Sequence, residues 1–274
     1  MQTAPARPNG NGAVVVFDHV QLAFDDNVVL KDVSFTLEKG HTKIILGASG
    51  SGKSTILKII TGLLRSDAGS IVVNGGRVDQ LSERELMAVR GDLGMIFQEG
   101  ALFDSLTVRE NVGYKLYEET NQPLEQVDRR VEEVLGFMGL SEHIDKMPSD
   151  LSGGQRRRVA IARAMAFKPS ILLYDEATTG LDPITATTVD DEIIKLRDLE
   201  GVSSIVVTHQ LRDAFYVATK MAVRGRDGVE IVQATPDKFD QSEFIMLKDG
   251  LVCFEGNAEE LRHSDDPYLK KFLS

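Results

Sequence analysis

The sequence predicts an α/β protein with a mainly parallel β-sheet, an N-terminal antiparallel β-region and an inserted α-helical block. Three observations predict this class. Apolar residues 43–46 lead through a glycine-rich run into a helical pattern, strand and helix patterns alternate after Pro169, and residues 14–46 resemble strands joined by polar turns. Strands that alternate with helices over short connections build parallel sheets, because each crossover packs back on the sheet.

The N-terminal region is predicted to contain antiparallel strands from residue 14 onwards. The turn residues Asp25-Asp26-Asn27 and Lys39-Gly40 mark the ends of two strands. In the first strand, alternate apolar residues are expected to share one buried face: Val14, Val16, Val20, Leu22 and Phe24. Residues 1–12 are rich in Pro, Gly and Asn and lack the apolar core of a signal peptide. They are predicted to be a disordered tail before a folded domain over residues 13–274.

The most informative segment is the run GASGSGKST at residues 47–55, which has the G-x-x-x-x-G-K-S spacing of a phosphate-binding loop. Glycines let backbone N–H groups converge on phosphate oxygens, and the N-terminus of the following helix adds partial positive charge. Lys53 is expected to reach the β- and γ-phosphates, and Ser54 to offer its hydroxyl to Mg²⁺. The candidate nucleotide-binding residues are Gly47, Ser49, Gly50, Ser51, Gly52, Lys53, Ser54 and Thr55. The alternative is an ordinary Gly/Ser-rich turn, which the flanking strand and helix patterns argue against.

Further elements follow along the chain. The loop helix is expected to end near Gly62, and residues 69–73 return to strand before a glycine turn. Residues 81–166 are predicted to form a mostly helical subdomain, because apolar residues recur at helical spacing: Val127, Val131, Val134, Leu135 and Met138. The predicted elements after Pro169 are strand 171–174, helix 185–199, strand 204–208 and helix 211–218.

Composition limits the classes of function. The formal net charge of −11 over 274 residues argues against bulk electrostatic binding to nucleic acid or to anionic lipid. The single cysteine, Cys253, excludes an internal disulfide framework and suits a reducing compartment. No apolar run approaches the roughly 18 residues that span a bilayer. We therefore expect a cytoplasmic protein that reaches a membrane only through a partner.

Two acidic residues complete the predicted ATP site. Asp175 and Glu176 follow the apolar run 171–174, and the carboxyl end of a buried parallel strand faces the ligand in such sheets. Asp175 is expected to help to hold Mg²⁺, and Glu176 to orient a water against the γ-phosphate as a general base. An acidic loop that caps the next helix is the alternative.

A third motif, LSGGQ at residues 151–155, precedes a helical pattern and resembles the signature of the ATP-binding-cassette (ABC) ATPases. A helix-capping turn explains serine and glycines equally well. The order of the whole set argues against that alternative, because the phosphate loop, Gln98, the signature, Asp175-Glu176, Leu181-Asp182 and His209 follow the order of the family. The resemblance covers essentially residue 14 to the end of the chain.

The resemblance implies ATP and Mg²⁺ as cofactors, and a homodimer whose subunits pack head to tail. Each nucleotide would lie between one phosphate loop and the signature of the opposite subunit. His209 would contact the γ-phosphate and the attacking water, and Gln98 would reach Mg²⁺ or water. Phe24 would stack on adenine, although its register with the apolar strand residues also fits a core position. The residues implied across the dimer interface are Ser152, Gly153, Gly154, Gln155 and Asp182.

Three segments resemble the Mla/Mce-type ATPases of bacterial phospholipid transport: residues 98–108, 181–185 and 266–273. This resemblance implies a membrane permease, an MCE-domain protein and often a STAS-domain protein, with the ATPase on the cytoplasmic face of the inner membrane. Leu102 and Phe103 are candidate anchors for a permease helix, and internal packing explains them equally well.

The sequence also departs from the family. Ala177 replaces a common proline, Thr179-Gly180 replaces a common Ser-Ala, and residues 224–243 form an apparent polar insertion that predicts a surface hairpin or loop. Two other functions remain open: an ATPase for import of small polar solutes such as amino acids, and a non-transport ABC protein of DNA repair or translation.

Overall fold

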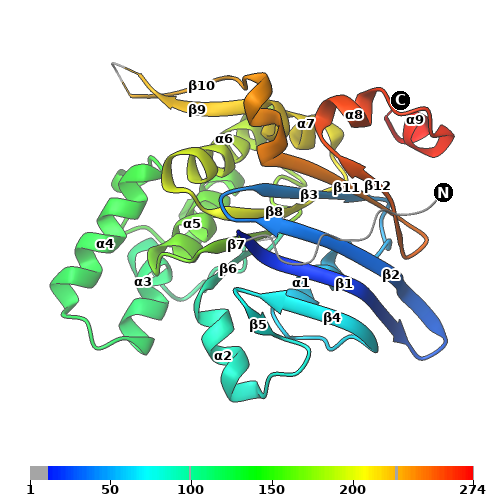
Figure 1. The fold of residues 1–274 in the computed structure, drawn as a ribbon. Helices are drawn as coiled ribbons and strands as arrows, with labels where there is room; N and C mark the ends of the chain where they lie inside the picture. The colour runs from blue at the N-terminus through cyan, green and yellow to red at the C-terminus, as the bar shows by residue number, and fades with distance from the viewer. Residues whose placement is uncertain (1–11, 99, 226–227, 274) are drawn as a thin grey trace.

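The computed structural model describes residues 12–98, 100–225 and 228–273. The tail predicted over residues 1–12 lies almost entirely outside the described residues, as do residues 226–227 of the apparent insertion. Ten strands of the described chain form one mixed sheet in the order β5-β4-β1-β2-β12-β11-β3-β8-β7-β6 (Figure 1). The sheet therefore combines an antiparallel and a parallel part, as the sequence predicts.

The parallel part of the sheet carries the site. It consists of β11 (Ser242–Lys248), β3 (Thr42–Gly47), β8 (Ser203–Val207), β7 (Ile171–Asp175) and β6 (Leu93–Ile96). Every residue of β3 is buried, and Ile44 and Leu46 pack into one hydrophobic core while Ile45 packs into the other. Burial on both faces explains why these strands are continuous apolar runs.

The antiparallel part is N-terminal and consists of β1 (Ala13–Phe24), β2 (Asn27–Glu38), β4 (Ala68–Val73) and β5 (Gly76–Arg77). A further strand, β12 (Leu251–Gly256), pairs with β11 and β2 and joins the two parts.

The predicted register of β1 is wrong at both ends. The buried residues are Val15, Phe17, Val20 and Leu22. An irregularity between Phe17 and Val20, where His19 has φ 51°, changes the phase of the alternation, so Val14 and Val16 lie on the other face.

The helices lie around the sheet (Figure 1). Their bounds are α1 (Lys53–Ile60), α2 (Glu83–Gly91), α3 (Val108–Glu119), α4 (Leu124–Phe137), α5 (Gly153–Ala166), α6 (Pro183–Glu200), α7 (Leu211–Thr219), α8 (Ala258–Arg262) and α9 (Pro267–Leu273). Short 3₁₀ turns cover Ser141–His143, Pro148–Asp150 and Pro236–Gln241. The five apolar residues predicted at helical spacing are all buried, which confirms the predicted face of α4.

The stretch predicted to be helical over residues 81–166 is not uniformly so. It contains β6, which pairs with β7 at the edge of the main sheet. Between β6 and β7, α3, α4 and α5 pack against one another on the left of Figure 1. The helical subdomain proper therefore begins after β6.

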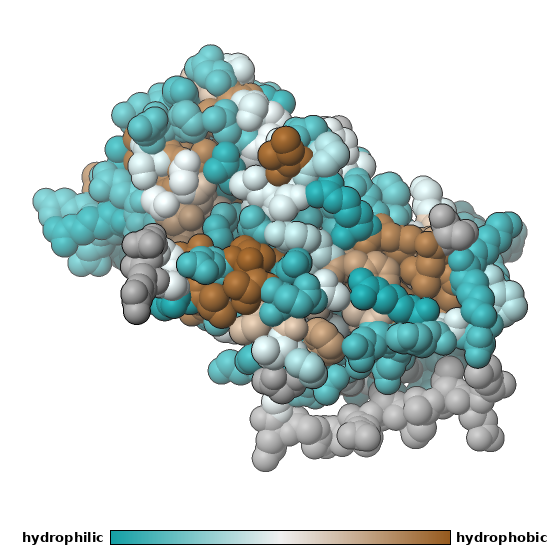
Figure 2. Space-filling view, turned by 90° about the horizontal axis from the view of Figure 1, so that it is seen from above, coloured by the Kyte–Doolittle hydropathy of each residue, from teal (hydrophilic) through white to brown (hydrophobic). Residues whose placement is uncertain are grey.

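The apparent insertion projects from the molecule. β9 (Lys220–Arg224) and β10 (Val229–Gln233) pair as a two-stranded antiparallel hairpin at the top of Figure 1. A hairpin agrees with the prediction, but the predicted bounds of 224–243 are wrong. The hairpin begins at Lys220, Pro236–Gln241 form a 3₁₀ turn, and Ser242 and Glu243 begin β11 of the main sheet. Viewed from above, hydrophilic residues surround separate hydrophobic patches (Figure 2). Among the described residues, no helix combines the length and the apolar character that a membrane crossing requires.

Candidate active site

The phosphate loop connects β3 to α1 and depends on its glycines. Gly52 precedes α1 with φ 99°, in the left-handed region, and a Cβ there would lie 2.9 Å from Leu30 Cδ2. A Cβ on Gly47 would lie 2.6 Å from Ser51 Oγ. Side chains at these two positions would clash with neighbouring atoms, so the loop could not keep this conformation.

Lys53 lies buried beneath the loop, with 5% of its surface exposed. Its Nζ donates hydrogen bonds to the carbonyl oxygens of Gly47, at 2.9 Å, and Ala48, at 3.1 Å. Burial lowers the pKa of this ammonium, while the charges of Glu176 and Asp175 act in the opposite direction. The loop carbonyls thus hold a cation at the floor of the site, where it can meet phosphate oxygens.

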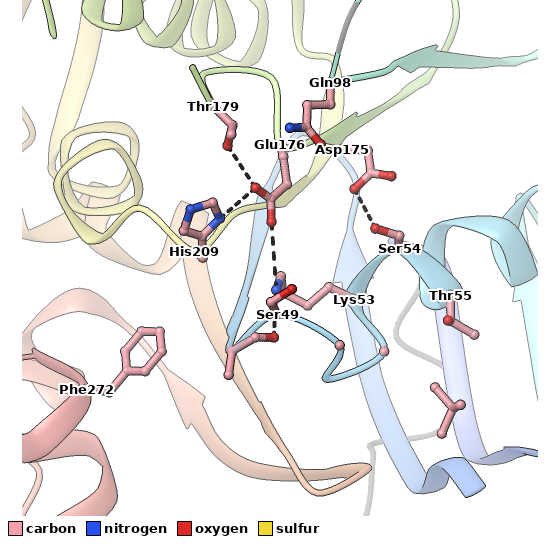
Figure 3. A pocket seen from close by; sticks show the side chains of 14 residues that line it. Ser49, Lys53, Ser54, Thr55, Gln98, Asp175, Glu176, Thr179, His209 and Phe272 are labelled. Carbon is pink, nitrogen blue, oxygen red and sulfur yellow. Dashed lines mark hydrogen bonds and ion pairs between the residues drawn. The ribbon is translucent and has the colours of Figure 1, made fainter. Parts of the chain in front are cut away.

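A pocket of about 820 Å³ opens over the loop (Figure 3). It brings together ten of the residues predicted from the sequence: Ser49, Gly50, Gly52, Lys53, Ser54, Thr55, Gln98, Asp175, Glu176 and His209. Four further lining residues were missed by sequence reasoning: Val29, Ala48, Thr179 and Phe272. Phe272 comes from α9 and lies within the C-terminal segment that resembles the Mla/Mce-type ATPases. That resemblance did not indicate that Phe272 would line the pocket.

The predicted magnesium ligands meet at one side of this pocket. Ser54 Oγ donates a 2.8 Å hydrogen bond to Asp175 Oδ1, and Gln98 lines the same pocket. Burial is the largest influence on Asp175 and raises the pKa of its carboxyl, so a divalent cation would offset the cost of its charge. A hydroxyl, a carboxylate and an amide oxygen fit Mg²⁺, which binds proteins through one or two carboxylates together with substrate phosphates. This donor set therefore suits the metal.

Glu176 is held from several directions (Figure 3). His209 Nδ1 lies 2.6 Å from Glu176 Oε2, and Thr179 Oγ1 donates to the same oxygen at 2.8 Å. The other carboxylate oxygen, Oε1, lies 3.8 Å from Lys53 Nζ. The backbone of Glu176 has φ 53° and its N–H donates to the carbonyl of Val207 on β8. A non-glycine residue held in the left-handed region is typical of active sites.

The signature residues lie elsewhere. Ser152 is exposed and caps α5: its Oγ accepts from the N–H of Gln155, and Gln155 Oε1 accepts from the N–H of Ser152. Ser152, Gly153, Gly154 and Gln155 are not among the residues that line the pocket. The helix-capping alternative is thus realised, and the exposed Ser152 and the first turn of α5 lie outside the pocket of their own chain.

The first turns of α5 and α6 are tightly packed. A Cβ on Gly154 would lie 2.0 Å from Thr185 Cγ2, so a side chain has no room there. Asp182 caps α6 by accepting from the N–H groups of Ile184 and Thr185, both at 3.1 Å. The hydrogen bonds from Thr185 hold the pKa of this carboxyl below its usual range. Asp182 is likewise not among the pocket residues.

Three aromatic and apolar residues had two possible roles. Phe24 is 45% exposed, so the core alternative is wrong, but Phe24 is also not among the residues lining the pocket. Leu102 packs against the larger hydrophobic core, which agrees with internal packing. Phe103 is 42% exposed, with its ring centroid 4.7 Å from that of Tyr114.

Comparison with known proteins supports this reading. Residues 30–179 match the ABC transporter family. The methionine import ATP-binding protein MetN of Bifidobacterium longum (strain NCC 2705) is 42% identical over 263 residues, which cover 91% of this chain and 65% of that protein. The chloroplastic protein TRIGALACTOSYLDIACYLGLYCEROL 3 of Arabidopsis thaliana is 35% identical over 283 residues, covering 97% and 75% of the two chains. This chain therefore spans less than two thirds of the length of the Bifidobacterium protein.

A solved structure gives the same result for the fold. The dimeric ATP-binding cassette MJ0796, in a post-hydrolysis state bound to ADP and Pi, superposes with a TM-score of 0.71 at 31% identity, over 89% of this chain and 98% of that one. The predicted α/β fold of an ABC ATPase is thereby confirmed. The chain belongs to the ABC transporter family, as an ATP-binding domain.

Proposed function

We propose that this chain hydrolyses ATP as one half of a head-to-tail homodimer bound to a membrane permease, on the cytoplasmic face of the inner membrane. The observation that carries the dimer is the separation of the two predicted halves of the site. Ser152 is exposed, and neither Ser152 nor Gly153, Gly154 and Gln155 line the pocket of their own chain. The related cassette MJ0796, bound to ADP and Pi, is dimeric, which supports the same arrangement.

The pocket residues that were predicted from the sequence each have a task in this proposal. The loop N–H groups and Lys53 bind the phosphates, while Ser54, Asp175 and Gln98 hold Mg²⁺, which neutralises phosphate charge. Glu176 accepts a proton from the attacking water, and His209 keeps its carboxylate in place. The N-terminus of α5 in the second subunit, with Ser152, Gly153, Gly154 and Gln155, binds the γ-phosphate.

The replacement Glu176→Gln tests this assignment. Without its base the enzyme should bind ATP normally but turn over at least about a hundredfold more slowly. Glu118→Gln, at an exposed position on α3, is the matched control and should keep the wild-type rate. Lys53→Ala should instead weaken ATP binding in a direct titration. Near-normal hydrolysis by Glu176→Gln would remove this residue from its role.

For the transported substrate, the curated relatives favour a small polar solute of the amino-acid class. The Bifidobacterium relative at 42% identity is named a methionine import protein, and so are relatives from other bacteria at 38–41% identity. This support is stronger than that for the lipid transport implied by the Mla/Mce resemblance. We therefore place amino-acid import first.

Lipid transport is the second candidate, and a specific observation favours it. The Arabidopsis relative, whose name contains that of a galactolipid, aligns with 97% of this chain, compared with 91% for the Bifidobacterium protein. Purification of the native membrane complex separates the two candidates. An MCE-domain or STAS-domain subunit with co-purified phospholipid supports lipid transport, whereas a soluble solute-binding subunit that retains an amino acid supports import.

A further inference from the structure

Thr179 lines the nucleotide pocket but has no role in the mechanism proposed above. In that pocket it lies beside Glu176 (Figure 3). Its hydroxyl also lies within hydrogen-bond distance of Gln210, the residue after His209. We propose that Thr179 is a positioning residue that fixes the carboxylate of Glu176 for proton transfer. This inference rests on the role proposed above for Glu176.

The first argument comes from how the two carboxylate oxygens are used. Thr179 Oγ1 and His209 Nδ1 both contact Oε2, at 2.8 Å and 2.6 Å. Oε1 is left facing Lys53 Nζ across 3.8 Å, on the side of the phosphate loop. The terminal torsion of a glutamate has a broad energy minimum, so one contact does not fix it. Two partners on one oxygen, from two different segments, leave the other oxygen for the water.

The second argument concerns the direction of the threonine hydroxyl. Gln210 Nε2 lies 3.4 Å from Thr179 Oγ1 and donates to it. A hydroxyl carries one hydrogen, and an acceptor site filled by Gln210 leaves that hydrogen for Glu176. The donor is therefore aimed at the carboxylate. Hydrogen bonds to a charged group are also stronger than those between neutral groups.

The third argument is that the backbone of Thr179 is itself held. Its N–H donates to the carbonyl of Glu176 at 3.1 Å, which closes a turn. Arg157 of α5, only 8% exposed, donates to the carbonyl of Thr179 at 3.3 Å and to that of Phe97 at 2.9 Å. One rigid guanidinium thus links the signature helix, the residue before Gln98 and the loop that carries Thr179.

Two substitutions of Thr179 separate the hydroxyl from the shape of the side chain. Thr179→Val keeps the branched shape and removes the donor, whereas Thr179→Ser keeps the donor. We expect Thr179→Val to lower kcat by roughly tenfold to a hundredfold, with KM for ATP changed by less than about twofold, because the lost bond involves a charged group. Thr179→Ser should retain at least about half of the wild-type kcat.

Thr188→Val is the matched control, since its hydroxyl bonds to the carbonyl of Ile184 within its own helix. It should leave kcat unchanged. Thr179→Val should also cause no further loss when added to Glu176→Gln, because a residue that acts through Glu176 has nothing left to position. All rates are measured on the full chain, and unchanged melting temperatures exclude misfolding.

Three results would overturn the inference: a wild-type kcat in Thr179→Val, an equal loss in Thr179→Val and Thr179→Ser, or a further loss of activity in the double variant. The last two would assign the effect to packing or to another partner. The proposed function fails separately, because normal hydrolysis by Glu176→Gln alone would refute the role of the base whatever Thr179 does.

Discussion

Ser54 Oγ, at the start of α1, donates a 2.8 Å hydrogen bond to Asp175 Oδ1, at the end of β7. The phosphate loop and the neighbouring strand are thereby joined through the two side chains that are expected to bind Mg²⁺. Among the described residues no group of three or more His, Cys, Asp or Glu is placed to hold a metal. A site with one carboxylate depends on the phosphates of the nucleotide for much of its affinity.

We predict that Asp175→Asn raises the Mg²⁺ concentration for half-maximal hydrolysis by at least about tenfold, because an amide lacks the charge that attracts the cation. Removal of Mg²⁺ with EDTA should abolish hydrolysis in the wild type. The ATPase rate is measured against free Mg²⁺. Asp145→Asn, at an 83% exposed side chain, is the control. An unchanged Mg²⁺ dependence in Asp175→Asn contradicts the assignment.

The proposed binding of the γ-phosphate by Ser152 of the second subunit gives a second prediction. Ser152→Arg should prevent ATP-driven dimerisation, because a long cation would occupy the surface that receives the γ-phosphate. Sedimentation with ATP in the Glu176→Gln background measures this. The substitution also removes the α5 cap, worth about 1 kcal/mol. Ser152→Ala is the comparison, because it removes the cap and the hydroxyl without adding a bulky cation, and it should still dimerise. A dimer that forms normally with arginine at this position counts against the proposed interface.

Stacking of adenine on Phe24 gives a third prediction. The ring of Phe24 is exposed. On β1, Phe24 follows Ala23, which pairs with Val28 of β2, and the residue after Val28, Val29, lines the pocket. Phe24→Ala should raise KM for ATP by roughly fivefold to a hundredfold, since stacking on a base is worth about 1–3 kcal/mol. Phe24→Tyr should bind ATP as the wild type does. If Phe24→Ala binds ATP normally, the base stacks elsewhere.

A buried acid between α6 and α7 gives a fourth prediction. Asp190 and Asp213 are 2% and 3% exposed, and Oδ2 of each has no hydrogen-bond partner among the described residues. Burial, and then the charge of Asp213, raise the pKa of Asp190 to about 8, against an opposing effect of Arg212. The folded state therefore keeps a proton that the unfolded chain releases near pH 4. The stability from this proton is complete below about pH 4 and is lost progressively as pH rises to the folded-state pKa of about 8.

Asp190→Asn should therefore flatten the fall in melting temperature as pH rises from about 5 to 8, because an amide does not ionise. Thermal unfolding at several pH values measures this. Asp145→Asn, on the surface, should keep the wild-type slope. A variant that loses stability as steeply as the wild type would show that Asp190 does not hold this proton.

The sequence predicted the parts of the fold that depend on local pattern. Apolar runs such as Ile171–Asp175 indicated buried parallel strands, and the order of motifs indicated which strand ends meet. β6 was missed because its four residues follow a helix within a few positions, and so short an apolar run has no period of its own. The irregularity at His19 was missed because one extra residue in β1 has no local signature.

The candidate site likewise contains residues that the sequence predicted and residues that it did not. Most residues at strand ends and in the glycine loop line one pocket, including Glu176 and His209, whereas the predicted loop residues Gly47 and Ser51 are not among the lining residues. Phe272 depends on where α9 docks, and the hydroxyl of Thr179 depends on a turn around a left-handed residue, so neither follows from spacing. The signature residues could not be judged in one chain, because their expected ligand lies in another.

The absence of a side chain at Gly154 has a mechanical meaning. Thr185 fills the space that a methyl group on Gly154 would need, so the first turns of α5 and α6 are in close contact. Neither can tilt without displacing the other. A pull exerted on Ser152 by a phosphate would thus reach the Asp182 end of α6 without passing through solvent, and a bulkier residue at position 154 would disengage the two helices.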